Sequence, residues 1–161
     1  MKKVLELGVI SSATRRPERV IPALLDALGS VAPEARAALM EEHELPTEAL
    51  TDDEHGYWQD ASPEMIGYLL HHTIDRVSDH APPYCYCGAH MGNSPDIGIW
   101  PDWHVIHDAV HDGCIYRIDS GAGWEDVPQS VGMVVDVSDP GNAELYRREP
   151  SGDWSPLWSV V

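Results

Sequence analysis

Phenylalanine is absent from this chain of 161 residues, and lysine occurs only at Lys2 and Lys3. With 43% hydrophobic residues the chain can still bury a core, which six Trp, six Tyr and the aliphatic side chains must fill. Three cysteines cannot all pair, so a disulfide framework is not expected and a reducing compartment fits better. No run approaches the roughly 20 apolar residues that cross a bilayer. We therefore expect a single cytoplasmic domain over residues 1–161 that does not enter a membrane.

Acidic charge is concentrated after residue 40. The whole chain carries a formal charge of −17, although residues 1–40 hold six basic and four acidic side chains. Residues 41–161 hold four basic and 23 acidic side chains, a net charge of −19. A field of that sign repels phosphate, so we expect no direct binding of nucleic acid. It attracts basic protein surfaces or metal cations, or it simply keeps the chain in solution.

The densest acidic cluster lies in a stretch without Lys or Arg that runs from Ala37 to Asp75. Such local repulsion is tolerated where the segment is solvated or meets a basic partner. We predict that the cluster as a whole forms a binding face for a basic protein. Its members are Glu41, Glu42, Glu44, Glu48, Asp52, Asp53 and Glu54.

The first part of the chain is predicted to be helical. Residues 16–19 open a segment with apolar side chains at helical spacing that ends near Gly29. A second helix is expected from Pro33 to Met40, followed by an irregular acidic stretch over 47–61. The chain therefore has a possible helical subregion at 1–45 and a main α+β region at 60–161, with a candidate linker at 42–61.

A third helix is predicted to start at Ser62 and Pro63, a capping residue followed by proline at the first helical position. On a helical wheel, His71 and His72 fall on the polar side, opposite the apolar stripe, and are expected to be solvated.

The rest of the chain has the pattern of strands. Apolar runs at 84–89 and 97–100 predict a hairpin, and helical spacing returns over 102–112. A strand at 114–118 follows. Residues 131–161 predict a three-stranded antiparallel meander with Pro140 and Gly141 at one turn. The predicted fold class is α+β, with N-terminal helices followed by an antiparallel sheet.

All three cysteines and four histidines lie between residues 85 and 114. His104, His107 and His111 lie on one flank of the predicted helix and could face the hairpin's Cys and His side chains around a tetrahedral zinc ion. However, Cys-x-Cys is not the usual zinc knuckle, and nothing matches His-Glu-x-x-His. The residues favour no metal or other cofactor. Zinc is the alternative, with the candidate ligands Cys85, Cys87, His90, His104, His107, His111 and Cys114.

No residue is predicted to be catalytic. The serines lack a Gly-x-Ser-x-Gly setting, and an acidic chain offers no electropositive surround to lower the pKa of a thiol. The residues favour a non-enzymatic protein, and a small zinc-dependent hydrolase that uses the His-rich segment is the alternative.

Residues 87–100 read CGAHMGNSPDIGIW. This run resembles a family of small tailed-bacteriophage proteins in which the segment reads aromatic-Gly-Ala-His-x-Gly-Asp-x-x-Asp-aromatic-Gly-aromatic-Trp. Residues 140–146 and the terminus 157–161, LWSVV, are similar to the same family. The resemblance covers roughly residues 60–161. The chain departs from it at Cys87, where the family has an aromatic residue, and at Pro140, where it has histidine.

The resemblance implies no particular activity, only a phage accessory setting. Within the motif, Gly88 and Gly98 are expected to allow close approach of the backbone. The turn residues His90, Asn93 and Asp96 either stabilise the loop or present a site at its mouth. Charge and resemblance together favour an accessory protein that binds a basic host protein, for example by imitating DNA to inhibit a nucleic-acid enzyme. A structural phage component is a further alternative.

Overall fold

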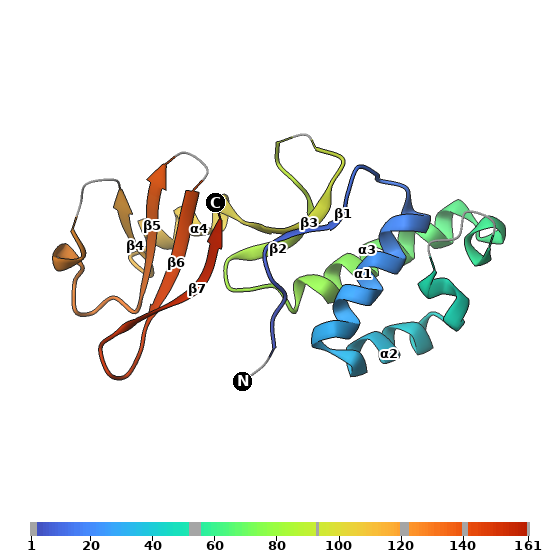
Figure 1. Cartoon of the computed structure of the whole chain (residues 1–161), viewed down its shortest axis with the longest axis horizontal. Coiled ribbons are helices and arrows are strands. Elements are labelled where there is room, and N and C mark those ends of the chain that lie inside the picture. Colours follow the sequence, from blue (N-terminus) through green and yellow to red (C-terminus); the bar gives the residue numbers. More distant parts are fainter. Residues whose placement is uncertain (1–2, 52–55, 93, 120–122, 140–141, 161) are drawn as a thin grey trace. The chain divides into compact units, whose positions relative to one another are not determined.

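The computed structural model describes residues 3–51, 56–92, 94–119, 123–139 and 142–160 (Figure 1). The chain divides into two compact units. Unit 1 consists of Met1–Ala81 and Cys85–Trp100, and unit 2 of Pro82–Tyr84 and Pro101–Val161. The predicted α+β class is confirmed. A single domain stays a prediction, and the boundary between the units lies at neither residue 45 nor residue 60.

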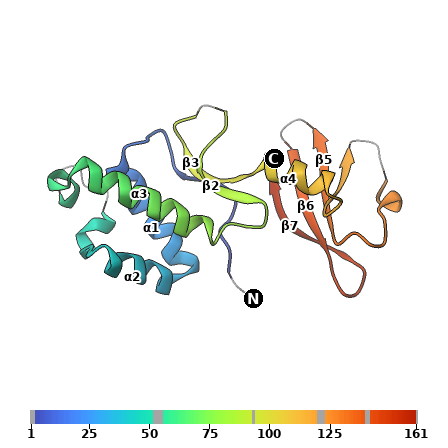
Figure 2. The ribbon, with the colours of Figure 1, turned by 180° about the vertical axis from the view of Figure 1, so that it is seen from behind.

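In the part of unit 1 that the structure describes, the α-helices are α1 (Pro17–Val31), α2 (Pro33–Glu42) and α3 (Pro63–Ser78). Each begins with proline, which has no backbone N–H. An N–H at the first helical position has no partner within the helix, so nothing is lost there. Ser62 caps α3 as predicted, because its Oγ accepts the N–H of Met65 at 3.2 Å. Helix α1 runs beside α3 (Figures 1 and 2) and packs against both other helices. Its fully buried aliphatic side chains are Val20, Ile21, Leu24, Leu25 and Leu28.

Two 3-10 helices, η1 (Thr47–Leu50) and η2 (Tyr57–Asp60), occupy part of the acidic stretch that was predicted to be irregular. Ala49 of η1 and Trp58 of η2 are buried in the core of unit 1, and Leu50 and Tyr57 pack against it. Both 3-10 helices are therefore attached to the folded core.

The sheet of unit 1 has the order β1-β3-β2, formed by β1 (Gly8–Ser11), β2 (Cys85–Ala89) and β3 (Ile97–Pro101). Strands β2 and β3 are neighbours, as the predicted hairpin requires. Strand β1 was not predicted from the sequence, because its apolar run is short and stands far from its partner in the chain. It pairs antiparallel with β3, with Val9 opposite Gly98.

The described residues of unit 2 form one α-helix, one 3-10 helix and four strands. In chain order these are α4 (Trp103–His111), β4 (Tyr116–Asp119), η3 (Trp124–Asp126), β5 (Met133–Asp139), β6 (Asn142–Arg148) and β7 (Trp154–Val160). Helix α4 lies on one face of the sheet (Figure 2). No helix among the described residues of either unit is long and apolar enough to span a membrane.

The sheet of unit 2 has the order β4-β5-β6-β7. The predicted meander is confirmed, because β5, β6 and β7 pair antiparallel, with Val135 opposite Leu145 and Leu145 opposite Trp158. The predicted turn at Pro140 and Gly141 lies outside the described residues. Strand β4 pairs parallel with β5. Periodicity had predicted a strand here, but it carries no information on strand direction.

Helix α2 ends in a Schellman motif without glycine. The N–H of Leu45 donates to the carbonyl of Met40 at 2.8 Å, and the N–H of Glu44 donates to that of Glu41 at 3.1 Å. Glu44 has φ +51°, in the left-handed region where the backbone of residues other than glycine is strained. The helix therefore ends at its own hydrogen-bonded turn, two residues beyond the predicted end at Met40.

Replacing Glu44→Gly is expected to stabilise unit 1 by about 0.5–1 kcal/mol, since glycine adopts positive φ without strain. Glu41→Gly removes the same charge inside α2 and is expected to cost about 1 kcal/mol. Urea unfolding followed by helical circular dichroism measures both. Equal destabilisation by the two variants would contradict the proposed end of α2.

Candidate functional site

The predicted acidic cluster lies where α2 ends. Glu41 and Glu42 form the last turn of α2, Glu44 follows it, and Glu48 is in η1; all four side chains are exposed. The remaining members Asp52, Asp53 and Glu54 lie outside the described residues. The described part of the cluster therefore presents four carboxylates around one helix end.

Glu42 differs from the other three because it has partners on α3. Its Oε2 lies 3.6 Å from a terminal guanidinium nitrogen of Arg76, and its Oε1 lies 3.8 Å from Nδ1 of His72. The sequence has no Lys or Arg from Ala37 to Asp75, but the end of α2 lies next to α3, which brings Arg76 to the acidic cluster. Among the described residues, Glu41 and Glu48 have no ion pair.

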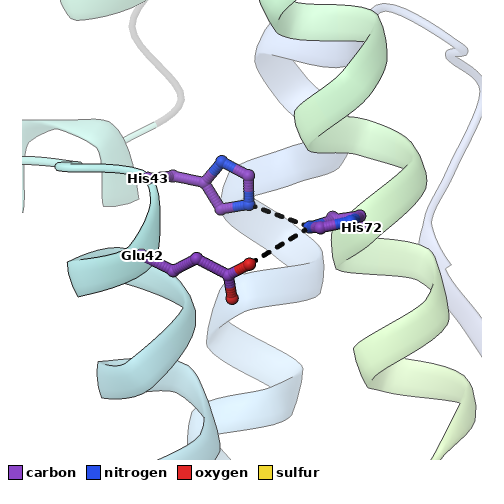
Figure 3. Close-up of side chains that lie close together, drawn as sticks. All are labelled: Glu42, His43 and His72. Carbon is purple, nitrogen blue, oxygen red and sulfur yellow. Dashed lines mark hydrogen bonds and ion pairs between the residues drawn. The ribbon is translucent and has the colours of Figure 1, made fainter.

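Two histidines, His43 and His72, lie next to Glu42 and form a group of three side chains with it (Figure 3). His43 is the C-cap residue of α2, and His72 lies on α3 with 29% of its side chain exposed. Nε2 of His43 lies 3.1 Å from Nδ1 of His72, which is a hydrogen-bond distance. One atom from each of Glu42, His43 and His72 lies within 4.8 Å of the other two. The prediction of a solvated His72 is thus wrong, because the end of α2 covers it.

An aromatic side chain borders the two imidazoles. The Tyr68 ring lies one turn before His72 on α3, with its centroid 4.5 Å from that of His72 and 5.7 Å from that of His43. The two imidazoles themselves meet edge to face at 5.2 Å. These contacts hold the two imidazoles against each other and against Tyr68.

The group formed by Glu42, His43 and His72 was not predicted from the sequence. His43 and His72 are 29 residues apart, and neither belongs to a ligand motif with short spacing. The signals available were a histidine just after the last turn of a predicted helix and a histidine on another helix. Neither signal predicts that the two helices pack together at that point.

The seven candidate zinc ligands of the Cys- and His-rich segment are distributed over the two units. Cys85, Cys87 and His90 belong to unit 1, whereas the three histidines of α4 and Cys114 belong to unit 2 and are exposed. Within the described parts of the chain, none of these seven residues contributes to a group of three ligand atoms at metal-binding distance. Burial raises the pKa of the Cys87 thiol to about 12, so this cysteine is protonated at neutral pH and is a poor ligand or nucleophile.

On the α4 flank, His107 lines an apolar pocket of about 190 Å³ together with Trp103, Ile106 and Val135. Arg117 is the other polar residue at its rim. No carboxylate, serine or cysteine lines the described part of this pocket. The histidines of the α4 flank are exposed.

At the predicted loop mouth, Asp96 ties the loop to a distant segment. Its Oδ1 accepts the N–H of Ala13 at 2.7 Å, and its N–H donates to Oγ of Ser94 at 3.2 Å. The Ala13 amide, the Ser94 hydroxyl and the nearby His90 hold the pKa of the Asp96 carboxyl below its usual range. Asp96 therefore stabilises the loop, as one of the two interpretations expected, and it also connects the start of β3 with the segment that follows β1.

His90 is also occupied within the loop. Its Nδ1 accepts the N–H of Gly92 at 3.0 Å, and its ring packs edge to face on Trp100 at 4.6 Å. Trp100 in turn donates its indole N–H to the carbonyl of Gly88 at 2.9 Å. Asn93 lies outside the described residues. These contacts support the structural interpretation of His90 and Asp96.

No protein-family model, curated protein or solved structure matches this chain. Charge and side-chain geometry therefore carry the functional inference.

Proposed function

We propose that this chain is a non-enzymatic accessory protein that binds a basic partner protein through the acidic end of α2 and the segment that follows. The observation that carries the proposal is the charge of residues 41–75, which contain ten acidic side chains and no Lys or Arg. Glu41, Glu44 and Glu48 are exposed around one helix end, where they are accessible to a partner. Because charges close together reinforce one another, such a group attracts a basic surface more strongly than scattered carboxylates do.

The basic side chains of the molecule do little to offset the negative charge of its carboxylates. Unit 1 has seven basic and 16 acidic residues, and unit 2 has three basic and 11 acidic residues. In unit 2, Arg117 pairs with Asp119 at 2.7 Å and Arg147 with Glu149 at 3.1 Å. Arg148 lies over the Trp154 ring at 4.5 Å. These arginines are engaged locally, which supports a net negative surface on both units.

The partner is proposed to be a nucleic-acid enzyme of a bacterial host, and the chain an accessory protein of a tailed bacteriophage. The likeness of residues 87–100 to the phage family supports the setting. Carboxylates grouped on one surface can compete with phosphates for a groove of Lys and Arg, which supports an inhibitor that imitates DNA. Such a protein would act in the host cytoplasm.

Capture from a bacterial lysate tests the proposal. The immobilised chain is expected to retain a basic protein at about 0.1 M salt and to release it at about 1 M, because the Debye length falls from about 10 Å to about 3 Å. Mass spectrometry identifies the captured protein. Retention of only acidic or neutral proteins, or retention that salt does not weaken, would contradict a charge-driven interface.

A further inference from the structure

We propose that Glu42, His43 and His72 bind one divalent transition-metal ion of the zinc class. This inference does not depend on the proposed function, since the three ligand atoms are defined by geometry rather than by net charge. It also differs from the Cys- and His-rich segment in both residues and location. The proposed site joins the C-terminal end of α2 to the middle of α3 (Figure 3).

The distances are close to those of a zinc site. Zinc binds imidazole nitrogen at about 2.0–2.1 Å, so two nitrogens of a tetrahedral site lie about 3.3 Å apart. Nε2 of His43 and Nδ1 of His72 are 3.1 Å apart, and Oε1 of Glu42 is 3.8 Å from Nδ1. All three ligand atoms lie within 4.8 Å of one another. To bind an ion, the two rings have to turn so that both lone pairs converge on it, and the exposed Glu42 side chain has to move toward them.

The protonation of the histidines is compatible with an ion. In the metal-free protein one of the two facing nitrogens carries a proton and the other accepts it. An ion needs both lone pairs, so the donating ring changes tautomer and carries its proton on the other nitrogen. The neutral imidazole is the form that binds metal. The carboxylate then neutralises part of the ion's charge.

The donor set selects the class of ion. Two imidazole nitrogens and one carboxylate suit zinc, cobalt, nickel or copper, whereas calcium and magnesium prefer oxygen ligands throughout. Arg76 contacts Oε2 of Glu42 and leaves Oε1 directed at His72, which positions the carboxylate. Three protein ligands leave at least one position for water, in keeping with a site that is partly exposed.

Metal titration of the purified chain tests the site. Calorimetry with Zn²⁺ is expected to give one equivalent per chain. Co²⁺ is expected to give the visible d–d bands of nitrogen and oxygen ligation without a thiolate charge-transfer band in the near ultraviolet. A thiolate band would assign the ion to Cys85, Cys87 or Cys114, and no binding of either ion would show that the cluster is only a hydrogen-bonded contact; each result overturns the proposal.

Single substitutions locate the ion. His43→Gln, His72→Asn and Glu42→Gln are each expected to weaken Zn²⁺ binding about tenfold or more, because each removes a ligand. Two control variants each remove a histidine that lies outside the proposed site. His71→Ala removes a neighbouring side chain that is 75% exposed and lies 3.6 Å from Asp75, and His107→Ala removes the centre of the α4 flank. Loss of Zn²⁺ binding in either control, with binding kept in the three ligand variants, would overturn the assignment.

A second measurement separates ligand loss from misfolding. Zn²⁺ is expected to raise the melting temperature of the wild-type chain and of both controls, because the ion binds only the folded arrangement. The ligand variants should show native circular dichroism without this metal-dependent rise. A ligand variant that melts earlier but keeps the full Zn²⁺-dependent rise would contradict the proposed ligand set.

Discussion

Gly98→Ala is expected to destabilise the sheet of unit 1 by about 2–3 kcal/mol. A Cβ atom at this buried position would lie 2.2 Å from the carbonyl oxygen of Gly8 and 2.9 Å from the Trp100 ring. The carbonyl belongs to the backbone of β1, so one strand has to move away from the other. Amide exchange measured by NMR should show protection in β1 and β3 falling about 30- to 150-fold, with tenfold for each 1.4 kcal/mol.

Gly67→Ala provides the matched control. Gly67 is exposed on α3, and a Cβ atom there meets nothing within 4 Å. Alanine is the better helix former, so this variant is expected to gain about 0.5–1 kcal/mol. If Gly98→Ala kept wild-type protection in β1, the close approach of β1 to β3 would be wrong.

Leu145→Ala is expected to destabilise the sheet of unit 2 by about 2–5 kcal/mol, the usual cost of truncating a fully buried leucine. Leu145 is 0% exposed and lies on β6 between Val135 and Trp158 of the neighbouring strands. The lost methyl groups leave a cavity that two strands can only partly close. Amide exchange in β5, β6 and β7 measures the effect.

Ser159→Ala tests whether the effect is specific to the buried face. Ser159 lies opposite Glu144 on β7 and is exposed, so its replacement is expected to change stability by less than about 0.5 kcal/mol. Similar losses in both variants would show that the register of β6 against β7 places the wrong residues inside.

The sequence was most informative where local chemistry decides the structure. Proline after Arg16 and after Ser62 marked the starts of α1 and α3, and the Ser62 cap is present as expected. Alternation of side chains predicted the meander of unit 2, because each strand lies next to its neighbour in the chain. These features depend on contacts between residues that are close in sequence.

Contacts between distant segments could not be predicted in this way. Strand β1 pairs with β3 some 90 residues later, and strand β4 is parallel to β5 although periodicity is the same for either direction. The Glu42–His43–His72 group could not be predicted for the same reason, since His43 and His72 meet only because α2 ends beside α3. The dense Cys–His segment attracted attention by composition, but the chain distributes its members over two units.

The acidic cluster was predicted from composition alone, and the structure refines it. Glu42 has Arg76 and His72 as partners, whereas Glu41, Glu44 and Glu48 are exposed at the end of α2 and in η1. The charge that could meet a partner is therefore carried by the latter three carboxylates among the described residues. They are the side chains to neutralise.

The most direct test is the salt dependence of binding to the basic protein captured by this chain. The triple variant E41Q/E44Q/E48Q and the control D108N/E125Q/D126N each raise the formal charge from −17 to −14, in unit 1 and unit 2 respectively. Three exposed ion pairs contribute roughly 0.2–1 kcal/mol each, so the first variant should bind about tenfold more weakly and with a flatter dependence on salt. The control should match the wild type. Equal weakening in both variants would show that overall charge, rather than the end of α2, drives binding, and unchanged binding in both would contradict the proposed function.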